Sequence, residues 1–223
     1  IDMVCWYENP NDKFERVRET IGKWGGLRYP MKWRQFLKRW NQSEGNLKGI
    51  LKSIGYDGEI LYSLHHHSHL ALSYYTSPFD KAIGLSIDGV GEFNTVFSAM
   101  CDDTGFHTIQ TLQFPHSLGL VYSAFTAYLG FKPNEGEYKV MGLAAYGDPE
   151  RFRSKVAQLI NFDGYKLSCN MDCFIWNKSD DTMFNYKLAD LLGIENRLPN
   201  TPLTDDHKDL AASVQERYEE LFF

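Results

Sequence analysis

Four histidines fall within a stretch of five residues, and the next apolar segment ends in an acidic glycine turn. The cluster His65-His66-His67-Ser68-His69 opens a predicted helix that ends at Ser77-Pro78, because the residue before a proline disfavours the helical conformation. The apolar run 82–87 has the length of a buried strand and leads directly into Asp88-Gly89-Val90-Gly91-Glu92. This order predicts a helix and a neighbouring strand that bring the histidines and Asp88 together.

The spacing of the histidines points to metal chemistry. His65 and His69 are four residues apart, so on a helix they share one face with an axial rise of about 6 Å between them. Two imidazoles at that spacing can bind one divalent cation. His66 and His67 point elsewhere, and together with His116 they are the candidates for an acid–base role. A helix start that is rich in histidine and binds nothing is the alternative.

The turn after residue 87 adds a hard oxygen ligand and a permissive backbone. A carboxylate at the end of a strand, here Asp88, can coordinate the same cation as the histidines. Gly89 and Gly91 let the backbone approach a ligand closely and can offer amides to phosphate oxygens, so they and Glu92 are predicted to contact a phosphate-bearing cofactor. Taken alone, such a turn is more typical of a plain hairpin, and only the neighbouring histidines favour a site.

Lys139 and His116 extend the set of candidate ligand contacts along the chain. Lys139 lies near the expected start of a helix, where a lysine and the helix dipole can both attract phosphate. An exposed lysine paired with Glu135 or Glu137 is the alternative. His116 precedes a strongly apolar helix and can be a cap, a ligand contact or an acid–base group.

The remaining pattern predicts a layered α/β fold without internal repeats. Strands are expected at 1–8, 59–64, 82–87, 92–101 and 107–114, with short strands near 165–168 and 172–175. Helices are expected at 11–24, 31–41, 47–54, 65–75, 118–129, 137–145, 149–160 and from 204 onward, and the rest of 161–203 is expected to be irregular.

Composition disfavours several classes of protein. The 223 residues, 43% of them hydrophobic, suffice for one large domain or two small lobes with a real core. A net charge of −6 argues against a nucleic-acid binder held by phosphate contacts. No apolar run approaches the roughly 20 residues of a membrane span. No signal peptide is visible and the four cysteines are widely spread, so we expect a cytoplasmic protein.

Together these segments resemble the NodU/CmcH-type O-carbamoyltransferase family. The resemblance covers nearly the whole chain and is specific in the combination of its motifs. It rests on the histidine cluster, the turn that follows it, Ser77-Pro78-Phe79, Phe114 to Tyr122, Tyr128 to Phe131, Glu137 to Gly147 and Asp209 to Gln215. The histidine run is also similar to the carbamoyl-transfer domain of hydrogenase maturation proteins, but the segment 114–147 favours the NodU/CmcH branch.

The resemblance implies a fold, a reaction and a set of ligands. The fold is an incomplete ribonuclease-H-like, actin/hexokinase-type ATPase fold, in which about 1–80 would end the first lobe and about 81–223 would begin the second. In the family a YrdC-like domain makes carbamoyl-adenylate from carbamoyl phosphate and ATP. The N-terminal domain then transfers the carbamoyl group to a hydroxyl of a small-molecule or sugar acceptor. A divalent metal, Fe²⁺ in the family, would be held by His65, His69 and Asp88.

Several family features have no counterpart in this sequence. They are an opening strand with a phosphate-binding turn, a later G-G-x-A-x-N loop, a final aspartate ligand and the YrdC-like domain. We therefore expect a fragment that holds half of a site and does not catalyse transfer alone. Two alternatives stay open: a related actin-fold transferase acting on a protein or a tRNA, the latter disfavoured by the acidic charge, and a non-catalytic nucleotide- or metal-binding module. The sequence does not identify the acceptor, the general base or the oligomeric state.

Overall fold

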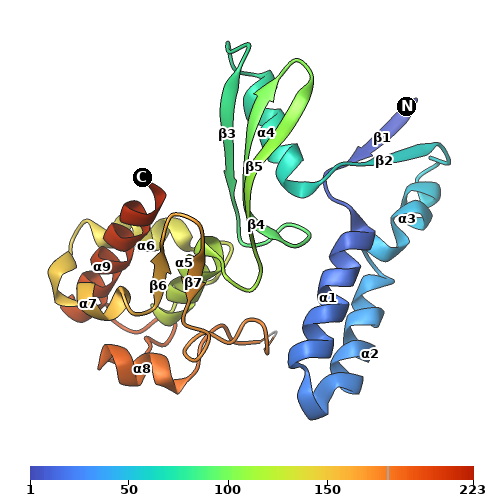
Figure 1. Ribbon diagram of the computed structural model, residues 1–223. Coiled ribbons are helices and arrows are strands. Elements are labelled where there is room, and N and C mark those ends of the chain that lie inside the picture. Colours follow the sequence, from blue (N-terminus) through green and yellow to red (C-terminus); the bar gives the residue numbers. More distant parts are fainter. Residues whose placement is uncertain (180) are drawn as a thin grey trace. The chain divides into compact units, whose positions relative to one another are not determined.

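The protein is described by a computed structural model that covers residues 1–179 and 181–223, with the backbone alone at Glu44. It divides into two compact units, Ile1–Gln113 and Phe114–Phe223 (Figure 1). Both units combine helices with β-strands, which confirms the predicted α/β class. No helix among the described residues combines the length and the apolar character that crossing a membrane requires. The lobe boundary near residue 80 refers to a complete two-lobe fold and stays a prediction.

The first unit holds a parallel pair of strands, a helical hairpin and an antiparallel sheet. Its elements are β1 Met3–Trp6, α1 Pro10–Trp24, η1 Gly26–Arg28, α2 Tyr29–Trp40, η2 Glu44–Asn46, α3 Leu47–Ser53, β2 Glu59–Tyr62, α4 His65–Tyr75, β3 Ala82–Ile87, β4 Asn94–Asp102 and β5 Gly105–Gln113. Strand β1 pairs with β2 in parallel, and β3, β4 and β5 form an antiparallel meander in that order. Every helix and strand predicted for this part of the chain is present, with ends shifted by a few residues.

The hairpin of α1 and α2 is held by aromatic side chains. The ring of Phe14 on α1 lies 5.5 Å, centroid to centroid, from each of the rings of Trp33, Phe36 and Trp40 on α2. Helix α1 begins at Pro10, and the side chain of Asn9 caps it by accepting a hydrogen bond from the Asn11 amide. The hairpin therefore starts at a fixed residue, Pro10. Glu8 and Asn9 lie in the short connection between β1 and α1.

Helix α4 packs against β3 and β4 (Figure 1), and a small hydrophobic core lies between the helix and the sheet. Leu70 on the helix and Phe97, Ala99 and Cys101 on β4 are buried together. The close approach requires a glycine on β3, because a Cβ atom at Gly84 would lie 2.8 Å from Cys101 Sγ and 2.9 Å from Leu70 Cδ2. The position of α4 on the sheet is thus fixed by shape, and the site described below depends on it.

The second unit is mainly helical. Its elements are α5 Leu118–Tyr128, α6 Glu137–Ala144, η3 Pro149–Arg151, α7 Arg153–Val156, β6 Ile160–Phe162, β7 Leu167–Cys169, α8 Tyr186–Leu192 and α9 Asp205–Phe222. Helix α9 contacts α6, η3 and α7, and α5 contacts α6 and α9. Phe125 and Tyr128 on α5 are fully buried, as expected for core residues. Ser117 caps α5 by accepting a hydrogen bond from the Leu120 amide.

Three predictions for this unit differ from the structure. Residues 149–160 are not one helix: Phe152 has non-helical dihedral angles, and its amide donates to Ser213 Oγ on α9 at 3.2 Å, away from the helical ladder. The segment 161–203, apart from residue 180, which lies outside the described residues, is also less irregular than expected. It contains α8, which is capped by Asn185 at its start and by Gly193 in the left-handed conformation at its end. The strand expected near 172–175 is reduced to a single bridge between Phe174 and Phe184.

Gly84→Ala should destabilise the protein, although alanine is otherwise the better residue in regular structure. The added methyl group would lie less than 3 Å from two buried side chains, which would have to shift, so we expect a loss of about 1–3 kcal/mol in the free energy of unfolding. Gly22→Ala on α1 is the matched control, because Gly22 is exposed and a Cβ atom there meets nothing within 4 Å. It should be neutral or stabilise by up to about 1 kcal/mol. Equal denaturant midpoints for the two variants would contradict the close packing at Gly84.

Candidate metal centre

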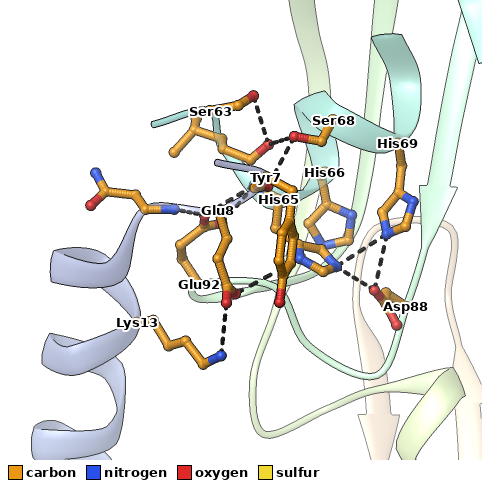
Figure 2. Close-up of polar contacts among 12 residues, drawn as sticks. Tyr7, Glu8, Lys13, Ser63, His65, His66, Ser68, His69, Asp88 and Glu92 are labelled. Carbon is orange, nitrogen blue, oxygen red and sulfur yellow. Dashed lines mark hydrogen bonds and ion pairs between the residues drawn. The ribbon is translucent and has the colours of Figure 1, made fainter. Parts of the chain in front are cut away.

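Helix α4 begins at His65 and takes its cap from a distant residue. The residue before it, Leu64, has no acceptor on its side chain. The buried carboxylate of Glu92 accepts the His65 amide instead, at 2.9 Å to Oε1 and 3.2 Å to Oε2 (Figure 2). Oε1 also accepts the Asn9 amide at 2.8 Å. A negative charge is favourable at the start of a helix, so Glu92 ties the starts of α1 and α4 to the turn after β3.

The turn after β3 is pressed against this helix start. A Cβ atom at Gly91 would lie 3.0 Å from both His65 Cβ and His66 Cδ2, so any other residue here would require these neighbours to shift. The Asp88 amide donates to Thr95 O at 3.0 Å, which extends the β3–β4 pairing to the end of the strand. Asp88 is therefore held at a fixed distance from the first turn of α4.

Three polar atoms converge at this point, as the sequence predicted for His65, His69 and Asp88 (Figure 2). His65 Nε2 lies 2.5 Å from Asp88 Oδ2 and 3.1 Å from His69 Nε2. His69 Nε2 lies 3.3 Å from Asp88 Oδ2. The two imidazoles come from successive turns of one helix face, and the carboxylate comes from the end of the adjacent strand.

The electrostatics of the group follow from these distances. The hydrogen bond that His65 donates to Asp88 raises the pKa of His65, against the opposing effect of burial, and the charge of Asp88 adds to the rise. The same hydrogen bond holds the pKa of Asp88 well below its ordinary range. Asp88 is thus a carboxylate near neutral pH, available as an anionic ligand.

The donor set and its geometry fit a divalent cation. Two atoms that are each bound at about 2.1 Å to one ion, at right or tetrahedral angles, lie roughly 3.0–3.5 Å apart. The two contacts of His69 fall in that range, and the shorter contact between His65 and Asp88 would have to open slightly. The His65 side chain is 14% exposed, whereas those of His69 and Asp88 are 53% and 38% exposed. One side of the group therefore faces solvent, where further ligands of an ion could bind.

Comparison with known proteins places the chain in a family. A family model described as Carbamoyltransferase N-terminus matches residues 11–223. The chain belongs to this carbamoyltransferase family. The family resemblance inferred from the motifs is thereby confirmed.

The relatives of this carbamoyltransferase-family chain are longer proteins. The uncharacterized protein sll1178 of Synechocystis is 39% identical over 96% of this chain and 36% of its own length. Nodulation protein NolNO of Sinorhizobium fredii is 35% identical over 74% of this chain and 22% of its own length. Nodulation protein NolO of Bradyrhizobium diazoefficiens is 34% identical over 71% of this chain and 27% of its own length. The chain thus spans about a third or less of the length of these relatives.

The ring of His66 is held inside this carbamoyltransferase-family structure, and an acid–base role for it stays a prediction. Its side chain is buried, and both ring nitrogens are used: Nδ1 contacts Ser86 Oγ at 2.7 Å and Nε2 contacts Asn94 O at 2.9 Å. Because a carbonyl oxygen only accepts, the proton lies on Nε2 and the serine hydroxyl donates to Nδ1. Burial lowers the pKa of His66, which keeps the ring neutral.

The other two acid–base candidates have different surroundings. His67 packs against the rings of Phe97 and Phe106, with centroids 4.9 Å and 5.6 Å away, and burial lowers its pKa. His116 belongs to the second unit, where its Nδ1 accepts the Cys169 amide at 3.1 Å, and burial lowers its pKa too. Both rings are neutral near pH 7, and their acid–base role stays a prediction.

The residues predicted to contact a phosphate-bearing cofactor are partly engaged within the fold. The Gly89 amide donates to Asp88 Oδ1 at 2.6 Å, and the Gly91 amide donates to Asn94 O at 2.8 Å. The carboxylate of Glu92 accepts the backbone amides of Asn9 and His65, so Glu92 would contribute to cofactor binding by holding the turn in place. Lys139 lies exposed in the first turn of α6, with Nζ near the rings of Phe131 and Tyr138. Contacts of these four residues with a cofactor stay predictions.

Sequence reasoning missed one buried residue beside the group, Glu8, which lies between β1 and α1. Its carboxylate accepts a hydrogen bond from Lys13 Nζ at 2.8 Å and lies 3.9 Å from His65 Nδ1. A glutamate and a lysine five residues apart near a helix start look like an ordinary surface pair in the sequence. Only the packing of the 1–8 segment beside α4 reveals the burial.

The pKa values of the cluster provide a first test. With metal removed by a chelator, His65 should titrate above the ordinary pKa of histidine and His66 below it, as followed by the ring-proton resonances in NMR. Because the folded-state pKa of His65 is raised, its protonated form stabilises the fold at low pH, and this contribution is lost as the pH rises through that pKa. Asp88→Asn should lower the pKa of His65. A pKa of His65 that the substitution leaves unchanged would contradict the pairing.

Replacing Glu92 tests the shared cap. Glu92→Ala leaves the amides of Asn9 and His65 without their acceptor, and each buried donor so left costs roughly 1–3 kcal/mol. We expect a clear fall in the free energy of unfolding by urea. Glu19→Ala, at an exposed position of α1, should leave it nearly unchanged. Equal midpoints for these two variants would show that Glu92 does not hold the two helix starts.

Proposed function

We propose that this chain is the metal-binding part of an enzyme that transfers a carbamoyl group to a hydroxyl. One observation carries the proposal: in a member of a carbamoyltransferase family, His65 Nε2, His69 Nε2 and Asp88 Oδ2 all lie within 3.3 Å of one another. The proposed donor is carbamoyl-adenylate, made from carbamoyl phosphate and ATP, and the proposed acceptor is a small molecule or a sugar. The proposed cation is Fe²⁺.

We also propose that the fold is part of an actin/hexokinase-type arrangement. Its support in this chain is the antiparallel meander β3–β4–β5, followed along the chain by the helix α5, an order found in ribonuclease-H-like lobes. The pair Asp88-Gly89 lies at the end of the first strand of that meander. Gly89 and Gly91 in the first unit and Lys139 in the second are each proposed to contact nucleotide in the complete protein, and Glu92 holds the turn that carries the two glycines.

In this proposal His65, His69 and Asp88 hold the cation, which when bound supplies Lewis-acid stabilisation of negative charge on an oxygen of the carbamoyl donor. The chain's own part is to keep these three ligands aligned. Glu92 fixes the backbone of His65, helix geometry places His69 one turn later, and the β3–β4 pairing fixes Asp88. Little rearrangement is needed for binding, and such preorganisation favours catalysis.

The transfer itself needs a proton acceptor. The hydroxyl oxygen of the acceptor forms a bond to the carbamoyl carbon, the bond from that carbon to the adenylate oxygen breaks with its electron pair, and the hydroxyl proton must go to a base. His67 and His116 are the candidates that the proposal keeps, because neutral imidazoles can accept a proton. His66 is not among them, since both of its ring nitrogens are hydrogen-bonded.

The proposal is tested with the full-length protein that contains this chain. ¹⁴C-labelled carbamoyl phosphate, ATP and Fe²⁺ are supplied with a panel of hydroxyl compounds, and labelled products are separated and counted. His69→Ala should remove both bound iron and transfer, whereas His107→Ala, at an exposed histidine on β5, should retain both. Iron content and transfer that survive in His69→Ala would contradict the site.

Residues 1–223 alone are expected to show no transfer in the same assay. The chain covers only 36% of the length of its Synechocystis relative, and the carbamoyl-adenylate-forming step is proposed to belong to the remaining part. Robust turnover by residues 1–223 would overturn this division of work.

A further inference from the structure

A second carboxylate stands on the other side of the His65 ring from Asp88. Glu8 is only 3% exposed, and a buried carboxylate needs partners to offset the loss of hydration. One oxygen, Oε1, accepts from Lys13 Nζ at 2.8 Å. The other, Oε2, lies 3.9 Å from His65 Nδ1, the ring nitrogen that faces away from Asp88 and His69 (Figure 2).

His65 Nδ1 is unusual among the buried polar atoms of the described residues, because it is shielded from solvent and makes no hydrogen bond there. Such atoms are rare in folded proteins and call for an explanation. The Tyr7 ring packs edge-on against the His65 ring, with centroids 5.7 Å apart, and the helix start fixes the backbone. The imidazole therefore has little freedom to turn Nδ1 toward another partner.

The two nitrogens of His65 have separate surroundings with separate consequences. Nε2 must present a lone pair to serve as a ligand beside His69 Nε2 and Asp88 Oδ2, so the ring proton must then reside on Nδ1. An N–H at Nδ1 points at a carboxylate oxygen 3.9 Å away, about 1 Å beyond a normal hydrogen bond. A hydrogen bond between these two atoms would require them to come closer by about 1 Å.

We propose that Glu8 is a positioning residue of the metal centre: its carboxylate binds the Nδ1 proton of His65 and thereby directs the Nε2 lone pair toward His69 and Asp88. This inference rests on the proposed metal site and adds to it a residue that the ligand set does not include. Carboxylates behind ligating histidines fix the tautomer and the ring orientation, and their loss typically weakens metal binding about 10- to 100-fold. Lys13 has a supporting part, because it offsets the charge of Glu8 and fixes its orientation.

The test measures Mn²⁺ affinity in the full-length protein, with the free ion counted by electron paramagnetic resonance. Glu8→Gln keeps the shape and a weaker acceptor, and the double variant Glu8→Met/Lys13→Met removes both members of the ion pair without leaving a lone buried charge. Affinity should fall by roughly 10-fold or more in the double variant, with Glu8→Gln intermediate. Asp102→Asn is the matched control, because it alters another histidine–carboxylate pair, with His107, at the opposite end of β4.

A second readout separates positioning from a merely structural role. In the Zn²⁺-loaded wild-type protein, the ¹⁵N resonances of His65 should show the proton on Nδ1. That proton should exchange slowly with water in the wild type and fast in the double variant. Equal Mn²⁺ affinity and equal Nδ1 exchange in wild type and double variant would overturn the role of Glu8 while leaving the metal site intact. Two results would overturn the metal site and this inference together. One is that the wild-type protein shows no saturable Mn²⁺ binding. The other is that His69→Ala leaves the saturable Mn²⁺ binding unchanged.

Discussion

The candidate site depends on a single buried charge, the carboxylate of Glu92. It accepts backbone amides from Asn9 and His65, residues that lie 83 and 27 positions away along the chain. Without it, α4 would begin after a leucine that cannot cap it, and the amides of Asn9 and His65 would lose the acceptor that they share. Gly91 then allows this turn to approach the helix to van der Waals distance. The alignment of His65 and Asp88 follows from these two constraints.

The surroundings of each imidazole give the four clustered histidines different chemistry. His65 and His69 share the face that turns toward Asp88, so they gain a carboxylate partner. His66 points into the sheet, where a hydroxyl and a carbonyl use both of its nitrogens. His67 lies on aromatic rings. A helix advances about 100° per residue, so consecutive histidines face different environments even though they are chemically identical.

Local periodicity was enough to predict most of the secondary structure and the convergence of His65, His69 and Asp88. The i, i+4 spacing of His65 and His69, and a strand that ends at Asp88, are short-range signals that survive in the structure. The strands expected at 92–101 and 107–114 and the helix expected at 118–129 are present as β4, β5 and α5. The Carbamoyltransferase N-terminus match agrees with the family that these motifs indicated.

Long-range partners explain what the sequence could not predict. Ser213 interrupts the helix expected at 149–160 through the Phe152 amide, 61 residues earlier in the chain. Glu8 looks like a surface residue in the sequence and Glu92 was predicted to contact a cofactor, but packing buries both carboxylates inside the fold. Helix α8 had local signals, namely Asn185, Gly193 and the buried pair Leu188 and Leu192 at i, i+4, that an otherwise polar segment obscured. In each case a tertiary contact or a weak local pattern decided the outcome.

Anomalous diffraction from crystals of the protein grown with Mn²⁺ tests the central claim most directly. We predict one strong peak at bonding distance from His65 Nε2, His69 Nε2 and an oxygen of Asp88, with His66 outside the coordination sphere. A fully occupied Mn²⁺ bound elsewhere, with no peak among these three side chains, would contradict it.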